Sequence, residues 1–360
     1  MKKVLILAAG TGGHIFPALA IAKALQQQSV EVAWIGTPQG LESKLLASES
    51  IPLYKISVRG LRGKGIKRCL FGSLQMIRAF FQSLGIIYRF KPNVVLAMGG
   101  FVCGPSGVAV WALRKKLILH EQNSVAGLTN KMLAPFAQKI LMGFPKTKGF
   151  SSTKCCYVGN PIRAEIEAIS EPEDRFQFHA GAIRLLIFGG SQGATSFNQE
   201  IPKVIAQLPQ ALRPEIWHQS GGQYYDQTVQ AYQQAQVEAK ITPFIEDMVE
   251  AYTWADLVIC RSGASSVAEL SAIGLAAIII PYPYHKDEQQ KYNAGFLVGQ
   301  GAAVLLTHQA LLEGKLTPVL HDLLSSREKL VSMAKAGRML RKEHVAEQIV
   351  SELRIEGESD

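Results

Sequence analysis

The sequence predicts an α/β protein that contains two doubly wound domains. Short apolar runs alternate with helical patterns through most of the chain, as they do in parallel sheets covered by helices. The pattern restarts after a polar connection at residues 171–182. In each half, the first apolar run leads straight into a glycine cluster that opens a helix. With 360 residues, the chain is long enough for two domains of ordinary size.

Most of the predicted strands are runs of four to six residues rich in Val, Ile and Leu, which suits strands buried on both faces. Each predicted helix repeats its apolar residues with helical spacing. In the first half we expect strand 4–7, helix 17–28, strands 31–35 and 53–56, helix 65–89, strand 93–97, helix 105–113 and strand 117–120. In the second half we expect strand 184–188, helix 196–208, strands 215–219 and 255–260, helix 265–273 and strand 276–280.

Charge is distributed unevenly between the halves. Residues 1–162 carry 21 Lys and Arg against 4 Asp and Glu, a net charge of +17, whereas residues 163–360 carry 17 against 25, a net charge of −8. The two totals give the net charge of +9 for the chain. We therefore expect the first half to face a negatively charged partner.

A basic, apolar segment occupies residues 59–81. Its apolar side chains recur at helical spacing and form a wider stripe than a core-facing helix needs. Such a helix can lie on an anionic lipid surface, and we expect that role here. A solvated basic face over an ordinary core helix is the alternative, and nucleic acid is not expected because aromatic residues are not interleaved with the basic ones. The residues expected to face the membrane are Arg62, Lys64, Lys67, Arg68, Leu70, Phe71, Leu74, Ile77 and Phe81.

Several other classes are disfavoured. The first glycine cluster has Ile15 at the third position of a dinucleotide fingerprint, and the cluster at residues 189–194 is not followed by the Lys-Ser/Thr of a nucleotide-triphosphate loop. The five cysteines show no C-x-x-C pair, so we expect no metal site, no disulfide framework and a reducing, cytoplasmic compartment. No apolar run is long enough to span a bilayer.

Two stretches in the second half contain residues that are suited to binding a ligand. Residues 261–269 place small residues at a predicted helix start and Glu269 about one turn inside, which suits a nucleoside diphosphate because free amides hold phosphate and a carboxylate accepts from ribose hydroxyls. A capping box, with Ser266 as cap and Glu269 reaching back, is the alternative. Residues 283–294 follow an apolar strand with a run of donors and acceptors that suits a ligand-binding loop, although a solvated loop also fits.

Eight motifs follow one another along nearly the whole chain: Gly10–Ala18, Gly60–Gly65, Gly99–Pro105, His120–Asn123, Gly159–Arg163, Gly189–Ala194, Arg261–Glu269 and His285–Ala294. Together they resemble those of the MurG family of peptidoglycan glycosyltransferases. The resemblance implies the glycosyltransferase B fold, in which two Rossmann-like domains flank a cleft and the last helix returns to the first domain. It divides the chain into an acceptor- and membrane-facing domain, residues 1–162 with the helix at about 341–360, and a UDP-sugar domain, residues 163–340.

The resemblance also implies an activity and its partners. The family transfers N-acetylglucosamine from UDP-N-acetylglucosamine to the C4 hydroxyl of the N-acetylmuramoyl group of undecaprenyl-linked lipid I, with inversion, and so forms lipid II. It works without a cofactor, as a peripheral enzyme on the cytoplasmic face of the bacterial inner membrane. The positions that it implies for the UDP-sugar are Thr11, Gly12, Gly13, Asn123, Arg163, Ser191, Ile245, Ala264, Ser265, Ser266, Val267, Ala268, Glu269, Gln289 and Gln290. The glycine loops of the first domain are also expected to receive the acceptor's diphosphate.

His14 is the expected general base, because the ordinary pKa of histidine, about 6.5, lies near neutrality. A structural role in the first turn of a helix is the alternative. The chain has no D-x-D motif, so helix amides are expected to stabilise the leaving diphosphate without an obligatory metal. Phe101 and Cys103 stand where family members commonly have Tyr and Ser, which puts acceptor contacts through those hydroxyls in doubt. A UDP-N-acetylglucosamine 2-epimerase and a non-catalytic scaffold of the lipid II pathway remain as alternative functions.

Overall fold

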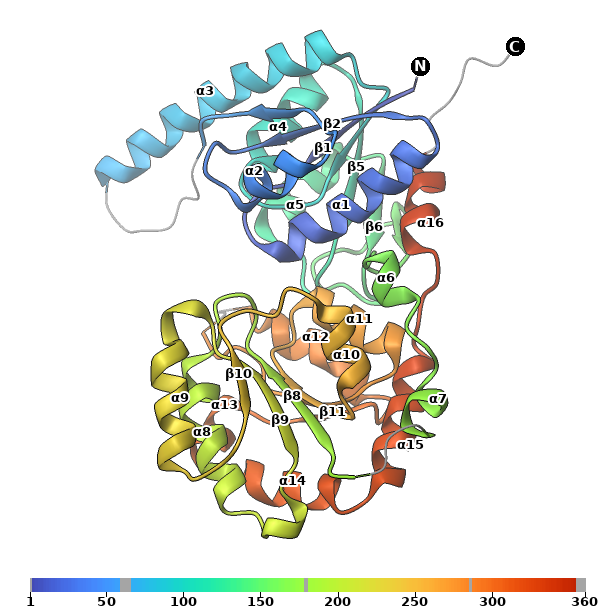
Figure 1. The fold of residues 1–360 in the computed structure, drawn as a ribbon. Coiled ribbons are helices and arrows are strands. Elements are labelled where there is room, and N and C mark those ends of the chain that lie inside the picture. Colours follow the sequence, from blue (N-terminus) through green and yellow to red (C-terminus); the bar gives the residue numbers. More distant parts are fainter. Residues whose placement is uncertain (1, 59–65, 178–180, 285–286, 354–360) are drawn as a thin grey trace. The chain divides into compact units, whose positions relative to one another are not determined.

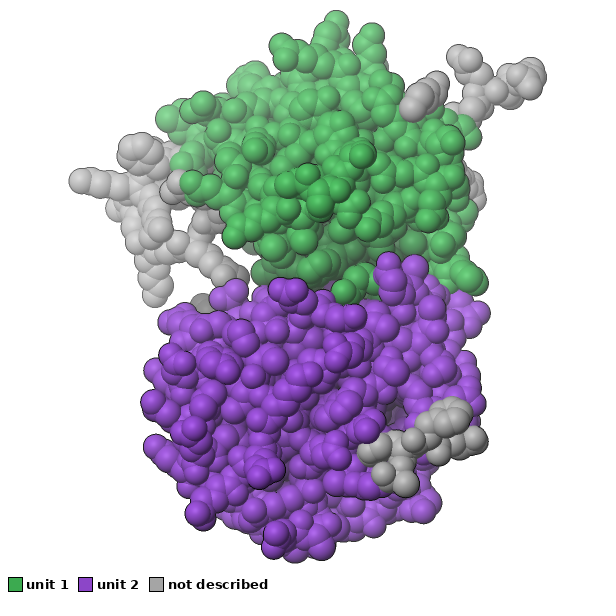
Figure 2. All heavy atoms as spheres, viewed as in Figure 1, with its two compact units in different colours: residues 1–163, 344–360 green, residues 164–343 purple. Residues whose placement is uncertain are grey.

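The chain divides into two compact units. The computed structural model describes residues 2–58, 66–177, 181–284 and 287–353, with side chains left undescribed at 66–72 and at 177. Unit 1 comprises residues 1–163 and 344–360, and unit 2 comprises residues 164–343 (Figure 2). Each unit contains one parallel sheet with helices on both faces, so the predicted pair of doubly wound domains is confirmed (Figure 1).

Unit 1 is built on a seven-stranded parallel sheet of order β3-β2-β1-β4-β5-β6-β7. Its strands are β1 (Lys3–Leu7), β2 (Glu31–Gly36), β3 (Leu53–Lys55), β4 (Val94–Ala97), β5 (Lys116–Glu121), β6 (Lys139–Met142) and β7 (Cys155–Tyr157). Its helices are α1 (Gly12–Gln27), α2 (Leu41–Leu45), α3 (Ile66–Phe90), α4 (Cys103–Ala112), α5 (Leu128–Leu133) and α16 (Val345–Glu352), with short 3-10 turns at Leu46–Ser48 and Ala134–Phe136.

The pleat of β1 explains why unit 1 has two apolar layers. Val4 and Ile6 point into a core shared with α1 and α16, whereas Leu5 and Leu7 point into a core shared with α3 and α4. The last helix, α16, packs against α1, and Lys116 Nζ donates to the carbonyl oxygen of Leu353 at 2.8 Å. The end of the described chain is therefore part of the unit that contains its beginning.

Unit 2 repeats the plan with a six-stranded parallel sheet of order β10-β9-β8-β11-β12-β13. Its strands are β8 (Arg184–Phe188), β9 (Glu215–Gln219), β10 (Lys240–Thr242), β11 (Leu257–Cys260), β12 (Ala276–Ile279) and β13 (Ala303–Leu305). Its helices are α6 (Ala164–Glu167), α7 (Pro172–Gln177), α8 (Thr195–Ala206), α9 (Tyr225–Gln234), α10 (Met248–Trp254), α11 (Ala264–Ile273), α12 (Gln289–Val298), α13 (His308–Leu312), α14 (Leu316–Leu324) and α15 (Arg327–Arg338), with 3-10 turns at Gln210–Leu212 and Gly222–Tyr224.

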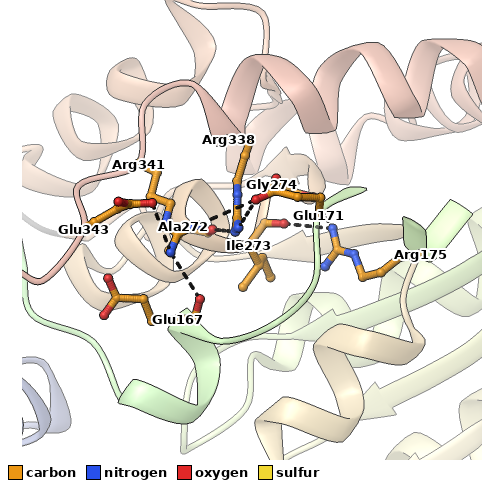
Figure 3. A network of polar contacts seen from close by, with 9 residues as sticks. All are labelled: Glu167, Glu171, Arg175, Ala272, Ile273, Gly274, Arg338, Arg341 and Glu343. Atoms are coloured by element: carbon orange, nitrogen blue, oxygen red, sulfur yellow. Dashed lines mark hydrogen bonds and ion pairs between the residues drawn. The ribbon is translucent and has the colours of Figure 1, made fainter. Parts of the chain in front are cut away.

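Two arginines hold the C-terminal end of α11 (Figure 3). Arg175 of α7 donates to the carbonyl oxygens of Ile273 (2.9 Å) and Gly274, and Arg338 of α15 donates to that of Ala272. Cations favour the negative end of a helix and satisfy its last carbonyl groups. Burial, followed by repulsion from Arg338, lowers the pKa of Arg175 to about 10, so its guanidinium stays charged at neutral pH.

Several elements differ from those predicted. α1 begins at Gly12 rather than at Pro17, so the glycine cluster is itself the first helical turn. The predicted polar connection at residues 171–182 contains α7. Helices α9, α10 and α12 to α15 were not predicted. The short strands β6, β7, β10 and β13 were not predicted either, because three- or four-residue strands give a weak periodic signal. No helix among the described residues is long and apolar enough to cross a bilayer.

Candidate functional site

In unit 1, successive strands are added toward one edge of the sheet from β1 to β3 and toward the other edge from β4 onward, so the strand order reverses between β1 and β4. Ligands of doubly wound sheets bind at such a switch point, outside the carboxyl ends of the strands. Thr11 is the N-cap of α1 and makes no side-chain cap hydrogen bond, while Gly12 and Gly13 are the first helical residues. Because the first amides of a helix have no intrahelical acceptor, this turn offers N–H groups to an anion.

His14 lies in the same first turn of α1. Its side chain begins a series of hydrogen bonds, the polar chain, that runs through Gln122 and His120 to Gly159. Its Nδ1 is 3.0 Å from Gln122 Oε1, and Gln122 Nε2 is 3.0 Å from Nδ1 of His120. Nε2 of His120 is 3.0 Å from the carbonyl oxygen of Gly159. Burial lowers the pKa of His120 to about 4, so this imidazole is neutral at pH 7. The sequence motif at residues 120–123 was noted, but the contact between Gln122 and His14 was not predicted.

Glycine at position 99, just after β4, allows the loop to approach the His14 ring. Gly99 has φ +99°, and a Cβ there would be 3.0 Å from His14 Cε1. Both the left-handed backbone and the close ring disfavour any larger residue. The loop after β4 therefore fixes one side of the imidazole.

Glu121 organises the loop that carries Asn123. Its Oε1 accepts from the backbone N and Nδ2 of Asn123 at 3.0 and 3.3 Å, and its Oε2 accepts from Gly127 N and Asn130 Nδ2, each at 2.9 Å. Glu121 is almost fully buried. This carboxylate was not predicted to matter, and its role is to shape the loop. Asn123 and Arg163 are both half-buried residues of unit 1.

The two positions that depart from the family pattern both face inward. Cys103 is fully buried, and its thiol donates to the carbonyl oxygens of Leu7 (3.2 Å) and Gly99 (3.0 Å). A serine hydroxyl could make the same bonds, so this side chain holds the loop after β4. Phe101 is half-buried and packs against the core shared with α3 and α4.

Unit 2 has its own switch point, between β8 and β11. Ser191 lies in an exposed turn after β8, and Gly263 is the N-cap of α11, whose first residues are Ala264, Ser265 and Ser266. The Ser265 Oγ is buried and has no hydrogen-bond partner within the described chain. Such a group needs an acceptor or donor, which a bound ligand can provide. This helix start is the second candidate anion site.

The next three predicted positions continue along α11. Val267 is fully buried, so its side chain packs in the core and only its backbone is available to a ligand. Ala268 and Glu269 are half-buried. The Tyr252 hydroxyl donates to Glu269 Oε2 at 2.8 Å.

The alternative capping-box interpretation of this stretch is wrong. The N-cap is Gly263, without a side-chain cap bond, and Ser266 is the third residue of the helix. Glu269 lies beyond the first turn, and its Oε2 receives the hydroxyl of Tyr252. The carboxylate is thus positioned by α10 rather than by the helix start.

Arg261 was quoted within a motif but given no role by the sequence analysis. Its Nη1 donates to the carbonyl oxygens of Ile280 and Pro281, both at 2.9 Å, and its Nη2 donates to Ser196 Oγ at 3.2 Å. Its guanidinium lies 4.5 Å from the ring centroid of Phe197. Burial lowers the pKa of Arg261 to about 10, so this buried guanidinium stays positively charged at pH 7. No sequence signal separates this arginine from a surface one.

The remaining positions expected to bind the UDP-sugar lie in unit 2, between β10 and α10 and at the start of α12. The Ile245 side chain is buried, and its backbone N donates to Gln219 Oε1 at 3.3 Å. Gln289 and Gln290 open α12, and Gln290 Oε1 accepts from the backbone N of Tyr282 at 2.8 Å.

Glycine is required at 193, because φ is +74° and a Cβ would be 1.9 Å from the carbonyl oxygen of Ser220. Among the described residues, no cluster of His, Cys, Asp and Glu could hold a metal ion.

The predicted membrane-facing residues fall into three groups. Arg62 and Lys64 lie outside the described residues, and Lys67, Arg68, Leu70 and Phe71 lie in α3 where side chains are not described. The side chains of Leu74, Ile77 and Phe81 are 64, 55 and 64% exposed. The opposite face of α3 buries Ala79 and Ile87. α3 therefore has an apolar face in the core and a second one exposed.

Family comparisons match both halves of the chain. Residues 4–142 match the glycosyltransferase family 28 N-terminal domain, and residues 184–349 match the glycosyltransferase family 28 C-terminal domain. A relative from Marinobacter nauticus is 43% identical over 97% of this chain and 96% of its own length. One from Acidithiobacillus ferrooxidans is 46% identical over 93 and 92%. Both are named UDP-N-acetylglucosamine--N-acetylmuramyl-(pentapeptide) pyrophosphoryl-undecaprenol N-acetylglucosamine transferase.

The chain belongs to the MurG family of glycosyltransferases. The solved structure of MurG from Acinetobacter baumannii has a TM-score of 0.83 at 36% identity, over 98% of this chain and 99% of that one. A Listeria monocytogenes structure described as a UDP-N-acetylglucosamine 2-epimerase has a TM-score of 0.69 at 14% identity. At that identity the likeness shows the fold alone, so it gives no support to the epimerase alternative beyond a shared architecture.

Proposed function

We propose that this chain transfers N-acetylglucosamine from UDP-N-acetylglucosamine to lipid I and releases UDP and lipid II. The observation that carries the proposal is the 42–46% identity, over more than nine tenths of the chain, with relatives named for this transfer. The chemistry of the two units supports it. Each presents a helix N-terminus at the switch point of a parallel sheet, and both the sugar donor and the lipid acceptor carry a diphosphate.

Unit 2 is the proposed donor-binding unit. The amides at the start of α11, with the partnerless Ser265 Oγ and with Ser191 after β8, would hold the UDP diphosphate. Glu269 would accept from the ribose hydroxyls, Ile245 would contact the uracil through its backbone, and Gln289 and Gln290 would contact the sugar. Charge developing on UDP as it leaves would then be stabilised by the fixed helix amides and by the positive charge of Arg261, which precedes the N-cap of α11 by two residues.

Unit 1 is the proposed acceptor-binding unit. The first turn of α1, Thr11 to Gly13, would face a diphosphate, and His14 would remove the proton from the attacking C4 hydroxyl. Asn123, in the loop organised by Glu121, and Arg163 would complete the substrate contacts. The net charge of +17 in residues 1–162 would favour a lipid diphosphate in an anionic membrane.

An exposed apolar surface on unit 1 is the proposed membrane contact. It consists of Leu74, Ile77 and Phe81 on α3, Trp111 on α4 and Met132 on α5, and α4 packs against both neighbouring helices. Exposed apolar patches of this kind mark interaction sites. With the basic residues of the segment 59–81, this surface would place the enzyme peripherally on the cytoplasmic face of the inner membrane.

The decisive assay measures UDP release by the purified protein with UDP-N-acetylglucosamine and a soluble lipid I analogue, in the presence of a chelator. We expect release that depends on the acceptor, is absent with UDP-N-acetylgalactosamine and persists without divalent metal. Formation of UDP-N-acetylmannosamine in the absence of acceptor would indicate the epimerase instead. Donor and vesicle binding without any UDP release, also with added metal and native lipid I, would indicate a scaffold.

A further inference from the structure

The polar chain from Gly159 to His14 determines where each proton lies. A carbonyl oxygen only accepts, so the bond from His120 to Gly159 requires the proton on His120 Nε2. His120 is fully buried and neutral at pH 7, so its Nδ1 carries a lone pair and accepts from Gln122 Nε2. The amide oxygen of Gln122 then faces His14 and accepts the proton of its Nδ1.

The orientation of the Gln122 amide is fixed by a second contact. Gln122 Nε2 also lies 3.3 Å from the carbonyl oxygen of His120, so both of its hydrogens have acceptors. With the amide reversed, its oxygen would face that carbonyl oxygen and repel it. The backbone of Gln122 and His120 is held as well. Asn160 Nδ2 donates to the carbonyl oxygen of Gln122 at 2.9 Å, and Asn130 Nδ2 donates to the carbonyl oxygen of His120 at 3.3 Å.

We propose that Gln122 and His120 are positioning residues that hold neutral His14 in the tautomer protonated at Nδ1, so that its Nε2 lone pair receives the acceptor's proton. The proposal rests on the proposed role of His14 as general base. In the reaction, the C4 oxygen forms the bond to the anomeric carbon, its proton passes to Nε2, and the bond to the UDP oxygen breaks with the electron pair leaving on UDP.

A neutral amide suits this role in both protonation states of His14. Before transfer, Nδ1–H donates to Gln122 Oε1, and after transfer the imidazolium keeps that same bond while carrying the new proton on Nε2. The polar chain therefore needs no rearrangement during the step. Gln122 is 1% and His120 0% exposed, so water does not compete for the bond between these two side chains.

The first test is a ¹⁵N spectrum of the histidine-labelled full-length protein, with His14 signals assigned by their loss in the His14→Gln variant. We expect neutral wild-type His14 to show the Nδ1–H pattern. In Gln122→Leu we expect a mixture of tautomers and a kcat about tenfold to hundredfold lower, with the KM for UDP-N-acetylglucosamine unchanged. A dominant Nε2–H tautomer in the wild-type protein would overturn the proposal.

A second variant covers loss of folding in Gln122→Leu. Gln122→Met matches the length and volume of glutamine without its amide, so we expect it to show the same mixture of tautomers and the same fall in kcat as Gln122→Leu. If His14→Gln retains full turnover, the base role itself fails. If His14→Gln is inactive while Gln122→Leu keeps wild-type kcat and tautomer, the base role stands and only the positioning proposal fails.

Discussion

Glu269 is a residue whose partner makes its role testable. Tyr252 donates to its Oε2 at 2.8 Å, which orients the carboxylate from the side of α10. Hydrogen bonds to a charged group contribute about 1.5–3 kcal/mol. We therefore expect Glu269→Ala to weaken UDP binding about tenfold to hundredfold, measured by titration calorimetry. Tyr252→Phe, the matched control, removes only the orienting hydroxyl and should weaken binding less. Equal affinities of Glu269→Ala and wild type would exclude the ribose contact.

The cysteines differ in their expected reactivity. Burial raises the pKa of both Cys103 and Cys260 to about 12, so these thiols stay protonated and unreactive at pH 8. Cys155 and Cys156 are half-buried and accessible in β7. We expect iodoacetamide to label Cys155 and Cys156 in the folded protein and to label Cys103 and Cys260 only after unfolding, as measured by peptide mass spectrometry. Equal labelling of all four in the folded state would contradict these placements.

The exposed apolar side chains of helix α3 lead to a prediction about membrane binding. Leu74 and Phe81 are each 64% exposed, and burying a large apolar side chain contributes about 1.5–3 kcal/mol. We expect the double variant Leu74→Gln, Phe81→Gln to lower binding to anionic vesicles at least about tenfold in a sedimentation assay. Turnover with a soluble acceptor should be unchanged.

The matched control for α3 lies on unit 2. Leu312 is 50% exposed on α13, so Leu312→Gln removes a comparable exposed side chain from outside the proposed membrane surface. We expect this variant to bind vesicles as the wild type does. Equal losses for both proteins would show that the effect is general, and the α3 surface would lose its assigned role.

At the scale of the whole molecule, each unit contains a buried histidine that predicts acid sensitivity. Burial lowers the pKa of His120 to about 4 and that of His218 to about 3, from 6.5. At a pH between 6.5 and the lowered pKa of each histidine, the unfolded chain binds more protons than the folded one. The free energy of unfolding therefore falls as pH drops below 6.5. The expected slope is about 1.4 kcal/mol per pH unit for each histidine.

Urea unfolding between about pH 5 and 7 measures this slope, since most carboxylates stay ionised there. His218→Gln should reduce the slope for unit 2 and leave that for unit 1 unchanged. Tyr232, whose hydroxyl lies 2.9 Å from His218 Nδ1, can still bond to the new amide. A pH-independent stability over this range would mean that both histidines bind protons to the same extent in the folded and unfolded states, and would contradict the lowered pKa values.

The fold class and the family follow from the amino-acid sequence without the coordinates. Strands such as Val4–Leu7 are apolar on both faces, and glycine clusters follow them, so local composition indicates parallel sheets with ligand loops at their ends. Motif order added the MurG resemblance. Apolar periodicity in α3 likewise predicted its second apolar face, because helical spacing is a local property.

The tertiary structure decided which side chains support one another. Gln122 reaches His14 from 108 residues away, Tyr252 orients Glu269 from α10, and Arg261 joins the ends of β11 and β12 to α8. The failed capping-box interpretation has the same origin, since Glu269 found its partner on another helix. Hydrogen-bond partners within a folded chain depend on which loops the strand order of the sheet brings together. Local sequence patterns do not predict that strand order.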